Sequence, residues 1–358
     1  MKGRRSKKGG LTVVEVSGTW KEMGGQYGAL LRDELRDVYE SMMKDRLRDH
    51  PHLEKDWDLL ADNIYMAYPL NIREFFLGMS RESGIDIKTL SYINAVEYCV
   101  GLPACSGLAV WGDYASGGLV YGRNYDYNTD FLKIKTDLVL TVFRPSDGSQ
   151  PVLTVGYAGE IYAVNGLNGS GIFIELNNAT PSGGADFDLD RLFSTERLMA
   201  LLFEADSLDY CDRFFHTVNS NQSYIIGMTD GKTAKSWEWD NIGARPLLPE
   251  KDGLMIITNY YQNPDWNFAE PEDENCWEGK TRVCNMRAMA DMNKGRIDGE
   301  KMCRIMETAV KDGGPLLEGE TVYQLVYRPE ESILSIKIIG NGDWTDFDTA
   351  ALLGEPVI

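Results

Sequence analysis

The chain has 358 residues, of which 43% are hydrophobic and 25% are charged, an ordinary balance for a globular protein long enough to bury a sizeable core. Its formal net charge is −19, and the acidic excess falls after residue 104: residues 1–104 hold 15 Lys and Arg against 16 Asp and Glu, whereas residues 105–358 hold 21 against 39. An acidic surface of this kind repels nucleic acids and anionic membranes, so we expect neither as a partner.

The start of the chain, MKGRRSKKGGLTVVEVSGTW, is basic but lacks the apolar region and the small-residue cleavage site of a signal peptide. We expect the first ten residues to be a solvated tail. No stretch approaches the roughly 18 apolar residues of a membrane-spanning helix, so we expect no membrane insertion. The six cysteines are widely spaced and contain no CxxC pair, which favours a reducing, cytoplasmic location.

Residues 20–98 have the periodicity of helices. In WKEMGGQYGALLRDELRDVYESMMKDRLRD the apolar residues recur at spacings of three and four, and IREFFLGMSRESG and IKTLSYINAVEYCVG repeat the pattern with glycine near their ends. We expect this part of the chain to form a helical segment that ends at about residue 104.

From Cys105 onward the hydrophobic period changes to two, which indicates strands. The expected strands are SGLAVWGD, GGLVYGRNYDY, TDLVLTVFRP, PVLTVGYAG, GIFIELNN, SYIIGMTDG, TAKSWEWDN, GLMIITNYY and two within TVYQLVYRPEESILSIKIIG. Helical patterns lie between them at 191–206, 208–219, 281–293 and 299–311. Consecutive strands with helices grouped between them predict an α+β fold, with two layers of sheet and helices outside.

Two other motifs predict no cofactor. GLNGSG at 166–171 matches neither the dinucleotide-binding nor the P-loop pattern and lies between two expected strands, so we interpret it as a turn. The candidate metal ligands lack the compact paired spacing of metal sites and are interpreted as structural residues; they are His216, Cys211, Cys276, Cys284 and Cys303. We therefore expect neither a metal nor a cofactor.

Cys105 stands at the start of a strand, in PACSGLAVWG, and is the candidate nucleophile. A nucleophilic thiol needs a base, and the three histidines of the chain (His50, His52 and His216) have no suggestive neighbours. The alternative base is the α-amine of Cys105 itself, which exists only if the chain is cut between Ala104 and Cys105. A free α-amine has a pKa of about 7.7 to 8.0, so it can accept the thiol proton near neutral pH.

The surrounding motifs resemble the N-terminal nucleophile (Ntn) hydrolases, in the branch of the choloylglycine hydrolases, the acid ceramidase-like amidases and, above all, the acyl-coenzyme A:penicillin acyltransferases. PACSGLAVWG followed by GLVYGRNYDY resembles the nucleophile segment, including the G-[RQ]-N-x-D element. GTWKEMGGQYG, NGLNGSGIFIELNN, IITNYYQNP and KTRVCNMRAM resemble further elements in the same order, over about residues 11–340. Ser106-Gly107 in place of Thr-Ser, and Tyr260 in place of a histidine, depart from the family pattern.

The resemblance implies a four-layer αββα sandwich in which residues 1–104 are a helical pro-segment and residues 105–358 the catalytic domain. It also implies self-cleavage between Ala104 and Cys105, after which the pro-segment stays associated. In this interpretation Cys105 is the nucleophile, Arg123 lowers the pKa of its thiol, and Asp126 holds the α-amine.

Further site residues follow from the same resemblance. Asn177 and Asn259 match the side-chain donors that stabilise an oxyanion. Arg282 is expected to add a second positive charge to the site, and Arg287 is an equally placed candidate for that role. The alternatives to a catalytic role are ordinary ones: hydrogen bonding at strand ends for the asparagines, and a surface ion pair for Arg123 and Asp126.

The sequence therefore predicts a self-processing cysteine amidohydrolase or acyltransferase that acts on a small N-acylated substrate through an acyl-Cys105 intermediate. Two alternatives remain open. One is a Cys-His hydrolase that uses His216 without cleavage of the chain. The other is an uncleaved, non-catalytic binding protein of the same fold in which Cys105 is a buried core thiol.

Overall fold

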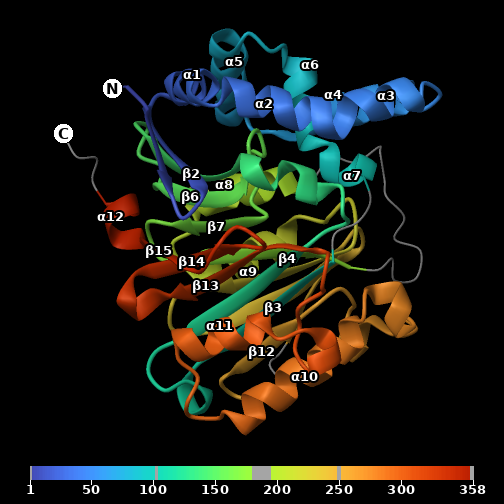
Figure 1. Cartoon of the computed structure of the whole chain (residues 1–358), viewed down its shortest axis with the longest axis vertical. Helices are drawn as coiled ribbons and strands as arrows, with labels where there is room; N and C mark the ends of the chain where they lie inside the picture. The colour runs from blue at the N-terminus through green and yellow to red at the C-terminus, as the bar shows by residue number, and fades with distance from the viewer. Residues whose placement is uncertain (1, 101–103, 180–194, 248–250, 355–358) are drawn as a thin grey trace.

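Two β-sheets packed face to face form the centre of the protein in a computed structural model, which describes residues 2–100, 104–179, 195–247 and 251–354 (Figure 1). In these residues the larger sheet has nine strands. In spatial order they are β1 (Arg4–Lys8), β2 (Leu11–Gly18), β5 (Leu138–Pro145), β6 (Val152–Tyr157), β7 (Asn165–Asn168), β8 (Phe173–Asn178), β9 (Tyr224–Thr229), β10 (Ala234–Asp240) and β11 (Gly243–Leu247).

The smaller sheet has six strands within the same described ranges. Their spatial order is β12 (Leu254–Ile257), β3 (Ala104–Val110), β4 (Val120–Asp126), β13 (Thr321–Arg328), β14 (Ile333–Ile338) and β15 (Thr345–Asp348). All of its pairings are antiparallel, and β3 lies against β8 of the larger sheet.

Helices cover the outer faces of both sheets (Figure 1). The helices on the side of the larger sheet are α1 (Trp20–Leu30), α2 (Arg32–Tyr39), α3 (Asp45–Asp49), α4 (Glu54–Ala67), α5 (Leu70–Ser83), α6 (Ile87–Asn94), α7 (Val96–Val100), α8 (Thr195–Glu204) and α9 (Leu208–Thr217). The smaller sheet is covered by α10 (Gly279–Met292) and α11 (Gly299–Glu307), and α12 (Thr349–Leu353) packs at the strand ends near the C-terminus. The four-layer αββα prediction is therefore confirmed.

The helices begin and end where the sequence supplies caps. Thr19 and Glu22 form a reciprocal capping box at the start of α1, and the Asp86 side chain accepts the Thr89 backbone N–H at the start of α6. Helix α5 ends at Gly84, whose φ of 71° is the left-handed conformation that glycine adopts without strain. The helical prediction for residues 20–98 is confirmed, with one π-helical turn at Glu40–Lys44.

The glycines of EMGGQYG allow α1 and α5 to pack backbone to backbone. A Cβ atom added at Gly24 would lie 1.9 Å from the Phe75 carbonyl oxygen, and one added at Gly28 would lie 2.4 Å from the Met79 carbonyl oxygen. Both contacts are far shorter than atoms tolerate. The glycines of the GTWKEMGGQYG motif therefore have a packing role, since only glycine fits at these two positions.

The N-terminus differs from the expected solvated tail. Residues Arg4–Lys8 form β1, with exposed side chains, and pair with β2, which is parallel to β5 and largely buried. The basic side chains do remain in solvent, but their backbone is part of the larger sheet. The N-terminal segment is thus not purely helical, because it also supplies two strands. The short elements β11, β15 and α12 were not predicted either. The first three residues of GLNGSG, which was interpreted as a turn, belong to β7.

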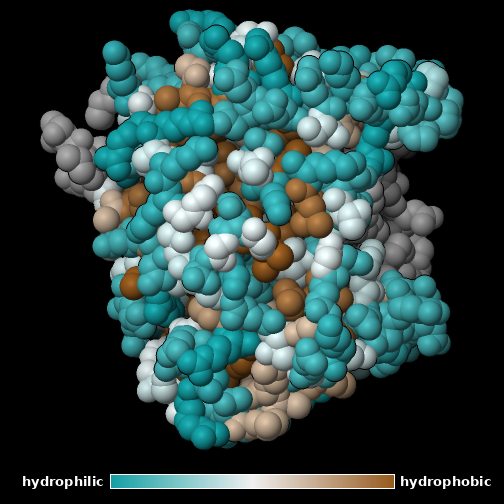
Figure 2. Space-filling model, viewed as in Figure 1, coloured by the Kyte–Doolittle hydropathy of each residue, from teal (hydrophilic) through white to brown (hydrophobic). Residues whose placement is uncertain are grey.

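Two apolar clusters fill the spaces between the layers. The larger one joins the helices at the top of Figure 1 to both faces of the larger sheet, and the smaller one lies between the smaller sheet and helices α10 and α11. Figure 2 shows a mostly hydrophilic exterior, with hydrophobic residues visible across the middle of this face. Within the described residues, no helix combines the length and apolar character needed to cross a membrane.

We predict that Gly24→Ala lowers the free energy of unfolding by about 1 to 3 kcal/mol, because the added methyl group forces α1 and α5 apart. Gly25→Ala is the matched control, since its Cβ would lie 3.1 Å from the Glu82 side chain, which can move, and 3.8 Å from the Gly78 carbonyl oxygen, an ordinary contact. Urea unfolding followed by circular dichroism measures both variants. Equal stability of the two variants would contradict the packing role of Gly24.

Candidate active site around Cys105

Cys105 lies in β3, between the two sheets, and only 1% of its surface is exposed. Its backbone N–H donates to Asn259 Oδ1 at 3.0 Å, and its carbonyl oxygen accepts from Arg282 Nη1 at 3.2 Å. Its Sγ lies 3.4 Å from Arg123 Nη2. The nitrogen, oxygen and sulfur of this one residue are therefore each in contact with a predicted site residue.

Arg123 comes from β4, the strand next to β3, and its guanidinium is fully buried. It donates to the Leu176 carbonyl oxygen at 2.8 Å and to Asn177 Oδ1 at 3.3 Å, both in β8 of the other sheet. The guanidinium thus bridges the two sheets beside the sulfur of Cys105. The non-catalytic alternative for Arg123 and Asp126, a surface ion pair between them, is wrong because both side chains are buried and each has another partner.

Asp126 ends β4 and stands opposite Ala104 in the register of β3 and β4. Its side chain points to the other face of the smaller sheet from Arg123, as expected for two residues that are three positions apart along a strand. Arg282 of α10 reaches it there: Arg282 Nη1 lies 3.0 Å from Asp126 Oδ2, and Arg282 Nη2 donates to Asn259 Oδ1 at 2.7 Å. The two arginines therefore approach Cys105 from opposite faces of the smaller sheet.

Asn177 and Asn259 form a reciprocal link between the sheets. Asn177 Nδ2 donates to the Thr258 carbonyl oxygen at 3.2 Å, and Asn259 Nδ2 donates to the Asn178 carbonyl oxygen at 2.6 Å. Each asparagine thus binds the backbone next to the other one.

The structure brings all six predicted side chains together, namely Cys105, Arg123, Asp126, Asn177, Asn259 and Arg282. Arg287 does not reach them: it follows Arg282 by five residues on α10, which turns it about 140° around the helix axis, and it lines a different cavity. His216 also lies elsewhere, on α9, where its side chain is 62% exposed and its Nδ1 contacts the Asp212 carbonyl oxygen at 2.7 Å.

Two buried site residues were not predicted from the sequence. Glu175 of β8 is fully buried, and its Oε2 lies 3.7 Å from Arg123 Nη1. Thr321 of β13 donates its hydroxyl to Asp126 Oδ1 at 2.6 Å. Glu175 carries a local signal, because it stands two residues before Asn177 in IELNN and so shares its face of the strand. Thr321 joins the site only through the pairing of β4 with β13.

Glu175 also explains one departure from the family pattern. A Cβ atom at Gly107 would lie 2.2 Å from Glu175 Oε1, so a side chain at position 107 would displace this carboxyl group. Glycine at this position therefore leaves room for the carboxyl partner of Arg123.

Burial dominates the proton affinities at the site. It raises the pKa of the Cys105 thiol to about 12, although the nearby Arg123 acts in the opposite direction. It also raises the pKa of Asp126 to about 7 against the effect of Arg282, and that of Glu175 to about 7 against the effect of Arg123. In the uncut chain the thiol is therefore protonated at neutral pH.

A separate cavity of about 420 Å³ lies at the edges of the two sheets, lined among others by Arg245, Leu254 and Ile256. The six site residues do not line it. In the described part of the chain, no group of three or more His, Cys, Asp or Glu side chains is arranged so that it could hold a metal ion.

No protein-family model matches the chain, and no curated protein matches it in sequence. Solved structures similar to it include an orthologue of N-acylethanolamine-hydrolyzing acid amidase from Caenorhabditis elegans, with a TM-score of 0.48 and 17% identity over 63% of this chain and 93% of that one. A mutant of the conjugated bile acid hydrolase from Clostridium perfringens has a TM-score of 0.46 and 12% identity, over 70% of this chain and 95% of that one. Penicillin V acylase from Agrobacterium tumefaciens has a TM-score of 0.41 and 11% identity, over 70% and 89%.

We predict that Arg282→Gln lowers the free energy of unfolding by about 3 to 5 kcal/mol, because it leaves the Asp126 carboxylate buried without its cation. Adding Asp126→Asn should recover part of that loss, since no unpaired charge then remains. Urea unfolding at pH 8 in the Cys105→Ala background measures both variants without participation of the thiol.

Arg304→Gln is the control for this pair, because Arg304 forms an exposed ion pair with Glu300 on α11 and should contribute less than about 1 kcal/mol. A double variant no more stable than Arg282→Gln alone would contradict the assignment of Arg282 as the cation for Asp126.

Proposed function

We propose that the chain is a self-processing amidohydrolase of the Ntn type, with Cys105 as its nucleophile. The observation that carries the proposal is the position of Cys105 itself. Its N–H is held by Asn259 Oδ1 and its Sγ faces Arg123, so the two atoms that must act as base and nucleophile after cleavage each have a polar partner. The sequence motifs around Cys105 support the same function.

Self-cleavage would begin when the Cys105 thiol attacks the carbonyl carbon of Ala104. The C–N bond between Ala104 and Cys105 breaks, a thioester forms, and the thiol proton passes to the departing nitrogen of Cys105. Water then hydrolyses the thioester, which releases the carboxylate of Ala104 and restores the thiol. The cleaved chain carries a free α-amine on Cys105.

In turnover this α-amine would accept the proton of the thiol, as in other nucleophiles activated by an N-terminal amine. Its ordinary pKa of about 7.7 to 8.0 leaves a useful fraction neutral near pH 7. Arg123 favours the thiolate by its positive charge, and Asp126, held by Arg282 and Thr321, provides a carboxylate near the start of β3. One residue thus provides both nucleophile and base.

The thiolate would attack the carbonyl carbon of an amide substrate and form a tetrahedral intermediate with a negative oxygen. The side-chain amides of Asn177 and Asn259 are buried, neutral and fixed by their bonds to backbone carbonyl groups, so they suit a preorganised oxyanion site. Collapse of the intermediate expels the amine and leaves an acyl-Cys105. Transfer of the acyl group to water makes the protein an amidase, and transfer to another acceptor makes it an acyltransferase.

We predict that the intact mass of the purified wild-type protein corresponds to two fragments of 104 and 254 residues, whereas Cys105→Ala gives a single chain. The variant lacks the thiol that opens the peptide bond. Mass spectrometry of the two denatured proteins makes the comparison. One uncut chain in both samples would contradict self-cleavage and favour the non-catalytic binding protein.

We also predict that the cleaved enzyme releases the fluorophore from some members of a series of N-acyl-7-amino-4-methylcoumarins with acyl chains of graded length. Asn177→Ala should lower kcat by about 10²- to 10³-fold, because it removes an oxyanion donor. His216→Ala should retain wild-type activity, since His216 is exposed on α9. Loss of activity in His216→Ala would instead support a Cys-His hydrolase.

A further inference from the structure

Glu97 is a buried carboxyl group of the N-terminal segment that the mechanism above does not use. It lies in α7, which ends at Val100, and β3 begins at Ala104. Only three residues of sequence therefore separate α7 from the residue whose carbonyl group is attacked in self-cleavage. Whatever holds Glu97 limits how far this end of the segment can move.

Two tyrosines hold Glu97: Tyr125, near the end of β4, and Tyr127, just beyond it. The hydroxyl of Tyr125 donates to Glu97 Oε1, and the hydroxyl of Tyr127 donates to the Glu97 backbone carbonyl oxygen at 2.7 Å. Tyr125 and Tyr127 stand on either side of Asp126 in the sequence. Because side chains alternate along a strand, Tyr125 shares the face of Arg123, which is the face that carries the sulfur of Cys105. The Tyr127 ring lies 6.1 Å from the Tyr125 ring.

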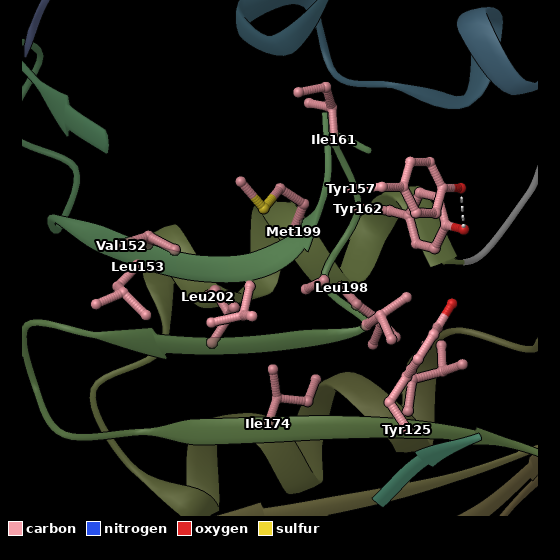
Figure 3. Packing of buried hydrophobic residues seen from close by; sticks show 14 of the residues in the cluster. Tyr125, Val152, Leu153, Tyr157, Ile161, Tyr162, Ile174, Leu198, Met199 and Leu202 are labelled. Carbon is pink, nitrogen blue, oxygen red and sulfur yellow. Dashed lines mark hydrogen bonds between the residues drawn. The ribbon is translucent and has the colours of Figure 1, made fainter. Parts of the chain in front are cut away.

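The two tyrosine rings are themselves fixed. The Tyr125 ring stacks on Tyr323 with ring centroids 4.6 Å apart and lies 5.8 Å from the Arg123 guanidinium, while the Tyr127 ring stacks on Phe131 at 3.6 Å. Figure 3 shows the Tyr125 hydroxyl directed toward Tyr157 and Tyr162. The hydroxyl groups of Tyr157 and Tyr162 hydrogen-bond to each other at 3.3 Å. Hydroxyl groups on rings held in this way offer Glu97 a rigid anchor.

The neighbourhood of Glu97 is polar and contains two other buried ionisable groups, Glu160 and Arg123. Burial raises the pKa of Glu97, and the hydrogen bonds from Tyr125 and Tyr162 act in the opposite direction. Burial also raises the pKa of a second carboxyl group, Glu160, and the nearby Glu97 raises it further. An uncharged group that accepts a hydrogen bond, such as the amide of glutamine, therefore fits the site of the Glu97 side chain.

We propose that Glu97 is a positioning residue for self-cleavage, which fixes the carboxyl end of the N-terminal segment against β4 so that the carbonyl group of Ala104 meets the thiol of Cys105. The inference rests on the self-cleavage proposed above. Ala104 and Cys105 are the first two residues of β3, and an intramolecular attack requires the carbonyl carbon at this strand end to stay within about 3 to 3.5 Å of the thiol and in line with it. A misplacement of about 1 Å costs as much as about 100-fold in rate.

The test follows the rate of cleavage in chains made by cell-free synthesis, labelled with radioactive methionine, chased, and separated on denaturing gels. It needs no substrate. Tyr127→Phe removes the hydroxyl that binds the Glu97 carbonyl group and keeps the ring that stacks on Phe131, so it should slow cleavage at least about tenfold. Glu97→Ala should slow it by as much or more. Glu97→Gln keeps an oxygen acceptor and should cleave within about twofold of the wild type.

Tyr68→Phe is the matched control, because like Tyr127→Phe it removes a buried tyrosine hydroxyl. The Tyr68 hydroxyl belongs to the N-terminal segment and donates to Asn94 Oδ1 at 3.0 Å. This variant should cleave at the wild-type rate. Wild-type rates in Tyr127→Phe and Glu97→Ala would overturn the role of Glu97 and leave the proposed function intact. Equal slowing in Tyr68→Phe, or a Gln variant as slow as the Ala variant, would also overturn it, whereas a wild type that stays uncut would refute self-cleavage itself.

Discussion

Two cations and two carboxyl groups are buried around one cysteine, and the arrangement of this site depends on their pairing. Arg123 faces Glu175 and Arg282 faces Asp126, with all four side chains out of contact with solvent. A buried charge without a partner is strongly destabilising, so none of the four can be moved independently of its partner. The elements that carry them, β4, β8 and α10, are therefore held in one arrangement, and Cys105 of β3 lies at its centre.

The asparagines extend this constraint from charges to the backbone. Because Asn177 binds the carbonyl oxygen of Thr258 and Asn259 binds that of Asn178, the end of β8 in one sheet is fixed to the chain just beyond β12 in the other. The same two amides are the candidate oxyanion donors. Their rigidity thus comes from bonds that also join the sheets, so the catalytic role proposed for these side chains is compatible with their architectural role.

The sequence predicted the layers and the six side chains of the candidate site, but by different routes. Hydrophobic period located the helices of residues 20–98 and most strands, because buried faces impose that period. The site residues came from motifs. The motifs could not distinguish Arg282 from Arg287 as the second cation. The structure distinguishes them, because the turn of α10 directs Arg282 and not Arg287 toward the site.

What the sequence did not predict depends on contacts between distant segments. The polar run RRSKK has no strand period, and it becomes β1 because β2 offers it a partner edge. Thr321 and Glu97 reach the site through strand pairing and through tyrosine hydroxyl groups, with no local pattern to mark them. Glu175 is the exception, because a buried acid two residues before Asn177 already stands on the correct face.

The parallel pairing of β2 with β5 has a consequence for the reversibility of folding. Residues 11–18 contribute a strand to a sheet whose remaining strands, β1 apart, come from residues after 104, so a cut before Cys105 would leave two chains within one sheet. The uncut chain folds as a single molecule, whereas the two separated chains would have to find each other, at the entropic cost of any association. Cleavage would then turn a unimolecular equilibrium into a bimolecular one, and the durability of the mature protein would be set by how slowly the sheet opens.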